Sequence, residues 1–199
     1  MKQEEDPTTF SSKLENHLNG PLPLLRRLRN FVFGTQQPDG VTKIIFYFHL
    51  ILWVIFFFWS MLQLIVLKNR DWIAEIKRIP VTELLNQRAQ TLGFESIIFI
   101  DRLQINYSIA LFLWSAYFVG LVLLWRKKMY YTYVIFTVLI AYLFTPLLLL
   151  GWTYWMEDIS TFDKIILLST ILITVIYTYF IKQSLLSKST QEDQLKDSL

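Results

Sequence analysis

The sequence has no cysteine and only two histidines among its 199 residues. The absence of cysteine excludes disulfide bonds, thiolate metal sites and thiol redox chemistry. His17 and His49 are far apart, one in a polar segment and one in an apolar run, so no metal site is expected. Patterns typical of serine hydrolases, zinc proteases and P-loop proteins are also missing. We therefore expect no catalytic residues, no metal, no cofactor and no enzymatic activity.

Charge is scarce as well: 18% of the residues are charged and 54% are apolar. The charged residues collect in short stretches between long uncharged runs. A helix needs about 20 apolar residues to cross the hydrocarbon core of a bilayer. The runs that reach or approach this length are 44–67, 105–125, 129–151 and 165–181. They predict an all-α membrane protein with four transmembrane helices, in which the third carries Pro146 and is expected to kink there.

The positions of lysine and arginine predict the orientation of these helices. Basic residues precede the first run, form the turn between the second and third, and follow the fourth. The loop between the third and fourth runs has three acids and one lysine, whereas the six basic residues of 68–104 are spread over a long loop. We expect a multi-pass protein of the bacterial inner membrane with both termini in the cytoplasm. Because 43 residues precede the first run, we expect that run to be retained as a signal anchor.

The N-terminal region divides into a loose polar segment, 1–22, and an amphipathic helix, 23–33. Apolar side chains recur on one face of this helix. Its basic residues, away from that face, are Arg26, Arg27 and Arg29. We expect the helix to lie in the inner leaflet against anionic lipid; the alternative is that it docks on the protein's own cytoplasmic surface. A patch of three arginines is too small for a nucleic-acid groove, so no direct nucleic-acid binding is expected.

Two further polar segments lie outside the spans. The loop 68–104 is too long for a plain connection, and its apolar periodicity predicts a small helical cap on the outer face of the membrane. The cytoplasmic segment 182–199 is polar, mixed in charge and free of aromatic residues. It is either a disordered tail or a frayed continuation of the fourth helix.

Three polar residues of the first span, His49, Ser60 and Gln63, share an arc of about 60° on a helical projection. Such a face is expected to point into the bundle or toward a partner. We interpret it as hydrogen-bonding contact between helices; the alternative is a polar conduit or a protonatable switch at His49. Since Ser60 lies about 16 Å from His49 along the axis, a partner of His49 must come from another helix or subunit.

The third and fourth spans carry small residues at intervals of four, which allow helices to approach closely. These residues are Thr137, Ala141 and Thr145 in the third span and Thr170, Thr174 and Thr178 in the fourth. Antiparallel pairing of the two spans is the natural use of these faces, and assembly with another subunit is the alternative. Ala116 and Gly120 form a lesser pair in the second span.

These features leave two classes of function. The first is an accessory protein of the bilayer that binds or modulates a larger system through a protein partner or through self-association. The second is an oligomeric pore or membrane-perturbing effector, supported by the polar face of the first span and by the outer cap.

The overall plan resembles the small four-span membrane accessory proteins found beside the RNA-targeting effector in type VI-B CRISPR loci. The likeness consists of a length near 200 residues, four spans, no enzyme motif and a composition rich in Phe, Ile, Tyr and Lys. The resemblance implies an antiviral-defence role as a modulator (repressor) of CRISPR RNA interference, with no cofactor. It assigns no role to any particular residue.

Overall fold

The computed structural model describes residues 27, 30, 32–34, 38–77 and 80–197, with side chains described as far as residue 181. Within these residues every regular element is a helix. The long helices are α3 (Gly40–Lys68), α6 (Ser96–Trp125), α7 (Tyr130–Glu157) and α8 (Thr161–Asp197), and the short ones are α4 (Arg70–Lys77) and α5 (Val81–Thr91). The chain divides into two compact units, Met1–Pro38 and Asp39–Leu199.

In the first unit the structure describes a few residues of the expected amphipathic helix. Arg27, Asn30, Val32 and Phe33 have helical backbone. Gly34 has a φ of 81°, and its amide donates a hydrogen bond of 2.9 Å to the carbonyl oxygen of Asn30. A left-handed glycine that closes the last turn is a common helix C-terminus. The other residues of the predicted helix, including Arg26 and Arg29, and the segment 1–22 lie outside the described residues.

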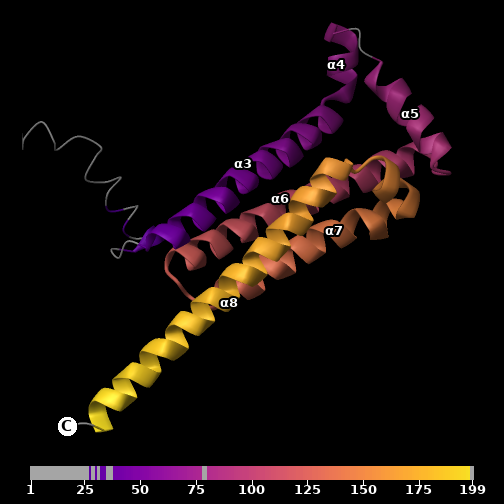
Figure 1. Ribbon diagram of the computed structural model, residues 1–199. Coiled ribbons are helices and arrows are strands. Elements are labelled where there is room, and N and C mark those ends of the chain that lie inside the picture. Colours follow the sequence, from indigo (N-terminus) through magenta and orange to yellow (C-terminus); the bar gives the residue numbers. More distant parts are fainter. Residues whose placement is uncertain (1–26, 28–29, 31, 35–37, 78–79, 198–199) are drawn as a thin grey trace, which may run out of the picture. The chain divides into compact units, whose positions relative to one another are not determined.

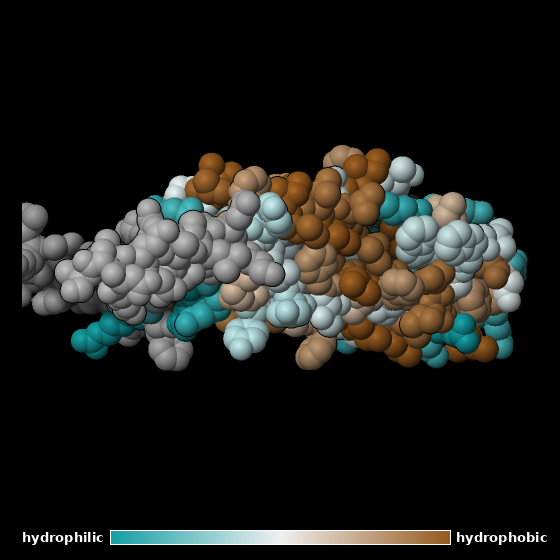
Figure 2. All heavy atoms as spheres, turned by 60° about the horizontal axis from the view of Figure 1, so that its bottom comes forward, coloured by the Kyte–Doolittle hydropathy of each residue, from teal (hydrophilic) through white to brown (hydrophobic). Residues whose placement is uncertain are grey.

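The second unit contains four helices that are long and apolar enough to cross a membrane: α3, α6, α7 and the part of α8 from Thr161 to Ile181. Their most apolar windows have mean hydropathies between 2.0 and 2.5. Figure 2 shows a broad hydrophobic band on one face, with hydrophilic residues toward its two ends. The predicted fold class is therefore confirmed, and the chain has the architecture of a multi-pass membrane protein.

Two helices extend well beyond the predicted spans. The second span was expected over 105–125, but α6 begins at Ser96, so the polar lead-in continues the same helix. The fourth was expected over 165–181, and α8 continues from Thr161 to Asp197. The segment from 182 to 197 thus continues the fourth helix, which was one of the two expected forms of the polar tail. Hydropathy locates the apolar centre of a helix, whereas its ends depend on caps and local propensity.

The helix α6 packs against both α3 and α7. Its large buried side chains Trp114 and Tyr117 are fully enclosed, and Trp114 stacks on Phe56 of α3 with ring centroids 5.1 Å apart. Gly120 allows α7 to come close: a Cβ atom there would lie 2.9 Å from Cγ1 of Ile135. Lipid tails are as apolar as the helices, so there is no hydrophobic driving force for helix association in a membrane. Close packing of this kind is one of the interactions that hold the helices together.

Within α7 the backbone leaves helical geometry at Gly151, where φ is 87° and ψ is 175°. This departure was not predicted; the kink was expected five residues earlier, at Pro146, which lies inside α7 and is buried. Glycine tolerates this backbone conformation because it has no Cβ. The last turns of α7, from Gly151 to Glu157, therefore take a different direction from the span that precedes them.

The loop 68–104 forms helices as predicted, and Figure 1 shows α4 and α5 together at one end of the long helices. A buried apolar cluster joins this cap to the ends of the spans through Ala89, Phe99, Tyr154 and neighbouring residues. Arg88 of α5 also pairs with Glu157 at 2.8 Å and with Asp158 at 2.6 Å. Hydrogen bonds to Asp158 and then Glu157 raise the pKa of Arg88 further above its usual value. The cap is thus fastened to the end of α7.

Candidate functional site

His49 lies at the centre of a buried polar network that joins three spans. Its side chain is 0% exposed. Its Nδ1 atom is 2.6 Å from the hydroxyl of Tyr117 on α6, and its Nε2 atom is 3.5 Å from Oγ1 of Thr174 on α8. The partners of His49 are therefore on other helices of the same chain, as its axial distance from Ser60 predicted.

The hydrogen-bond pattern defines the form of the imidazole ring. The hydroxyl of Thr174 donates to the carbonyl oxygen of Thr170 at 2.7 Å, so its oxygen is left to accept from Nε2–H of His49. Nδ1 then accepts from the hydroxyl of Tyr117. This is the neutral tautomer with the proton on Nε2, in which each ring nitrogen has one partner.

A second group of hydroxyl contacts fastens α8 near the turn between α6 and α7. The hydroxyl of Tyr131 on α7 is 2.6 Å from Oγ1 of Thr178, and Oγ1 of Thr132 is 3.1 Å from the same atom. On α3, Oγ1 of Thr42 bonds the hydroxyl of Tyr177. These contacts place the predicted small-residue face of α8 against both α7 and α3.

Asp39 begins α3 and ties it to the turn between α6 and α7. Its Oδ1 atom accepts from Oγ1 of Thr42 at 2.6 Å and is 2.5 Å from Nζ of Lys127. The ammonium group of Lys127, with help from Thr42, holds the pKa of Asp39 well below its usual range. The sequence carries a signal for this cap, an Asp a few residues before the apolar run that begins at residue 44, which the prediction overlooked.

The structure brings together only part of the predicted set. Ser60, Thr170 and Thr174 are buried, with exposures of 1%, 0% and 0%. Gln63 is half-buried, as are Ala141 and Thr145, whereas Thr137 is exposed. The residues of α7 that contact the hydroxyl of Thr178 are Tyr131 and Thr132, one to two turns before Thr137. Residues spaced four apart lie on one face of a helix, but the spacing does not show which neighbouring helix that face contacts.

A cavity of about 70 Å³ lies between the spans, and it was not predicted. Its walls come from all four long helices. The polar and aromatic residues that line it are Trp59, Asn106, Tyr107, Tyr142, Thr145, Tyr154, Asp158 and Asp163. Asn106 marks the polar start of the second span in the sequence, but only the tertiary fold shows that these residues meet.

Two polar groups of this cavity have no hydrogen bond or ion pair with the residues that the structure describes. Asn106 is 8% exposed, and its side chain forms no hydrogen bond with the described part of the chain. Asp163 likewise forms no ion pair there. By contrast, Asp158 is engaged by Arg88, and the hydroxyls of Tyr107 and Tyr154 lie 3.4 Å apart. The cavity can therefore offer a ligand both a carboxylate and an amide.

Among the residues with described side chains, no group of three or more His, Asp or Glu could hold a metal ion. In comparisons with protein-family models, curated proteins and solved structures, nothing matches this chain. Its function must therefore be argued from its own residues.

Proposed function

We propose that the protein is a non-enzymatic membrane accessory protein that binds and modulates a larger system. The observation that carries this proposal is the burial of His49 and Ser60 against other helices of the same chain. The two residues are enclosed by the fold, so they act as contacts between helices. This use of the polar residues of α3 in packing is consistent with a protein that acts by binding.

The pore hypothesis rested on the polar face of the first span. A conduit requires that face to meet water, yet both ring nitrogens of His49 are engaged by Tyr117 and Thr174. The outward side chains of α3 are large and apolar, among them Ile51, Phe58 and Leu62. Such a surface suits lipid or an apolar helix of a partner or second copy, which supports the accessory role over the pore.

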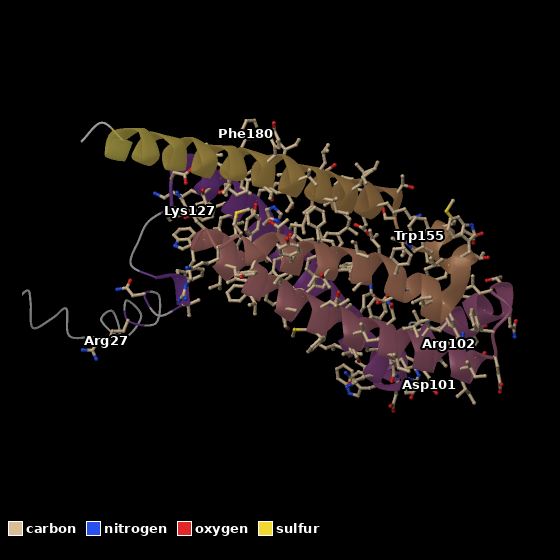
Figure 3. The ribbon with its side chains drawn as sticks, turned by 90° about the horizontal axis from the view of Figure 1, so that it is seen from below. Arg27, Asp101, Arg102, Lys127, Trp155 and Phe180 are labelled. Atoms are coloured by element: carbon tan, nitrogen blue, oxygen red, sulfur yellow. The ribbon has the colours of Figure 1, made fainter. Side chains whose placement is uncertain are left out.

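We propose that the protein lies in the bacterial inner membrane with both termini of the chain in the cytoplasm. Lys127 lies at the end of the bundle opposite Trp155 and Arg102 (Figure 3). The same end holds the start of α3 and the basic turn of Arg126 to Lys128 (Figure 1). Three adjacent basic residues in that short turn support its assignment to the cytoplasmic side, whereas the six basic residues at the other end are spread over the long loop 68–104.

The larger system proposed is the RNA-targeting effector of a type VI-B CRISPR locus, which the overall plan of the sequence resembles. The chain is proposed to repress RNA interference from the cytoplasmic face of the membrane, without a cofactor and without contacting nucleic acid itself. The four spans of the structure are consistent with that plan.

The test measures silencing of a targeted transcript by a type VI-B effector with and without this chain in the same cells. Co-expression of the native chain is expected to weaken silencing. The control is Gly120→Ala, which disturbs the approach of α6 and α7 and should weaken the effect in proportion to the folded protein lost. Stronger silencing supports a modulator but contradicts the repressor role. Unchanged silencing, with the chain present in the membrane, contradicts the proposal.

A further inference from the structure

The cavity between the spans contains polar groups that have no hydrogen-bond or ion-pair partner among the described residues. Asn106 projects from α6 with only 8% of its surface exposed, lines the cavity, and has no hydrogen bond to any described residue. Polar side chains of low exposure are nearly always hydrogen-bonded, either to protein or to ordered water. The amide of Asn106 faces the cavity and is therefore available to bond an occupant.

Asp163, on the first turn of α8, adds an unpaired carboxylate to the same cavity. The other acid in the lining, Asp158, is held by the guanidinium group of Arg88. The neighbouring cation Lys164 is directed elsewhere: its Nζ atom donates to the carbonyl oxygen of Met156 and lies 4.5 Å from the ring centroid of Trp155. Asp163 therefore gives the cavity a negative charge that no described side chain neutralises.

Aromatic side chains line the same cavity. Trp59 of α3, Tyr107 of α6, and Tyr142 and Tyr154 of α7 all line the cavity. Aromatic faces attract cations, and several rings beside a carboxylate are the usual surroundings of a bound ammonium group. Pro146 also lines the cavity. Because proline has no N–H, the carbonyl of Tyr142 loses its helical donor and becomes a further acceptor.

Size limits the occupant. The cavity volume of about 70 Å³ compares with about 30 Å³ for one water molecule in the liquid. It therefore accommodates two waters, or an ammonium group with one or two carbon atoms. The second occupant matches the carboxylate, the acceptor oxygen of the amide and the aromatic rings at the same time.

We propose that this cavity binds a small organic ammonium group, with Asp163 and the amide oxygen of Asn106 as hydrogen-bond acceptors and the aromatic side chains around the cation. The group is either a free amine or the headgroup of an ethanolamine lipid. The binding site does not depend on the proposed accessory function, and its test does not use silencing.

The test uses ligand-observed NMR of ethanolammonium with the purified full chain in nonionic maltoside micelles. Saturable binding is expected. Ethylene glycol, which is neutral and of similar size, should bind much more weakly. Asp163→Asn and Asn106→Leu should each weaken ethanolammonium binding about tenfold or more, because hydrogen bonds to charged groups are the strong ones. The matched control Asp101→Asn, an exposed acid of α6 outside the cavity (Figure 3), should bind like the native chain.

The source of the ligand follows from repeating the measurement in nanodiscs of phosphatidylethanolamine. Loss of the ethanolammonium signal there shows that the lipid headgroup occupies the cavity, and persistence of the signal identifies a free amine; both support the site. Far-ultraviolet circular dichroism confirms that each variant is folded. The proposal is overturned if ethanolammonium does not bind in micelles, if ethylene glycol binds equally well, or if folded Asp163→Asn and Asn106→Leu bind as the native chain does.

Discussion

The two ends of the four-span bundle treat their polar side chains differently. Toward the α6–α7 turn, polar groups of one helix meet polar groups of another: Thr42 meets Tyr177, and Thr178 meets Tyr131. Toward the cap formed by α4 and α5, Asn106 and Asp163 border a cavity without such partners. We refer to these regions as the paired end and the open end.

The difference separates polar residues that stabilise the fold from polar residues that are available to a ligand. Within a membrane, hydroxyl contacts between helices contribute modestly to stability but specify which faces meet. The paired end has such contacts on α3, α6, α7 and α8, with His49 between Tyr117 and Thr174. At the open end the hydroxyls of Tyr107 and Tyr154 also meet, but Asn106 and Asp163 have no such contact with a described residue and remain available to a ligand.

The largest effect is expected in a cysteine-labelling test of which end of the bundle faces the cytoplasm, because each introduced cysteine is either accessible to the reagent or protected from it by the membrane. The chain has no cysteine, so Gln87→Cys on α5 and Lys128→Cys in the α6–α7 turn are single sites at exposed positions. In intact spheroplasts an impermeant thiol reagent should label Gln87→Cys, and Lys128→Cys only after lysis. The reverse pattern contradicts the proposed orientation.

The close approach of α6 and α7 should be the most sensitive packing contact. Gly120→Ala places a Cβ 2.9 Å from Cγ1 of Ile135, and overpacking of this kind lowers the free energy of unfolding by about 1–3 kcal/mol. The matched control is Gly40→Ala, whose Cβ meets nothing within 4 Å. Reversible unfolding in mixed micelles measures both. Equal stability of the two variants shows that the helices are less closely packed than described.

At the paired end, Asp39 should contribute a pH-dependent part of stability. Asp39→Ala removes the N-cap of α3, a loss of about 1 kcal/mol, together with the ion pair to Lys127. The folded-state pKa of Asp39 is lowered, so its stabilisation is complete above the unfolded pKa of about 4 and is lost as pH falls toward the lower folded value. Unfolding measured between pH 7 and pH 3 should show this loss.

Asp39→Asn is the control for the charge, because asparagine also caps helices well. It should retain most of the stability at pH 7 and lack the contribution of Asp39 to the pH dependence. A native chain whose pH profile matches that of Asp39→Asn rules out a contribution from the ion pair with Lys127.

The smallest effect is expected at His49. His49→Leu removes its bonds to Tyr117 and Thr174, and an interhelical hydrogen bond in a membrane stabilises by about 0.6 kcal/mol on average and about 1.7 at most. The variant should insert, fold and retain its activity. A double-mutant cycle with Tyr117→Phe measures the coupling, and strictly additive losses indicate that the two side chains do not interact.

The sequence predicted the spans from the length of its apolar runs, and the polar face of α3 from the helical period, because both are properties of a single helix. It also identified Thr170, Thr174 and Thr178 as a contact face, although not the roles of Tyr131 and Thr132 as their neighbours. Thr137 belongs to a series with the same four-residue spacing, yet its side chain is exposed. Packing with the other helices decides how α7 is rotated about its axis, and the spacing alone does not show this. The cavity could not be foreseen, since its walls are separated by up to about a hundred residues, from Trp59 to Asp163.

The most direct test of the account is ion flux across liposomes that contain the purified native chain. If the buried polar residues of the paired end join helices rather than line a conduit, the leak of protons and potassium should equal that of protein-free liposomes. His49→Leu should give the same result. A leak above that background contradicts the account, and a leak that His49→Leu abolishes in a folded protein assigns His49 to a conduit instead.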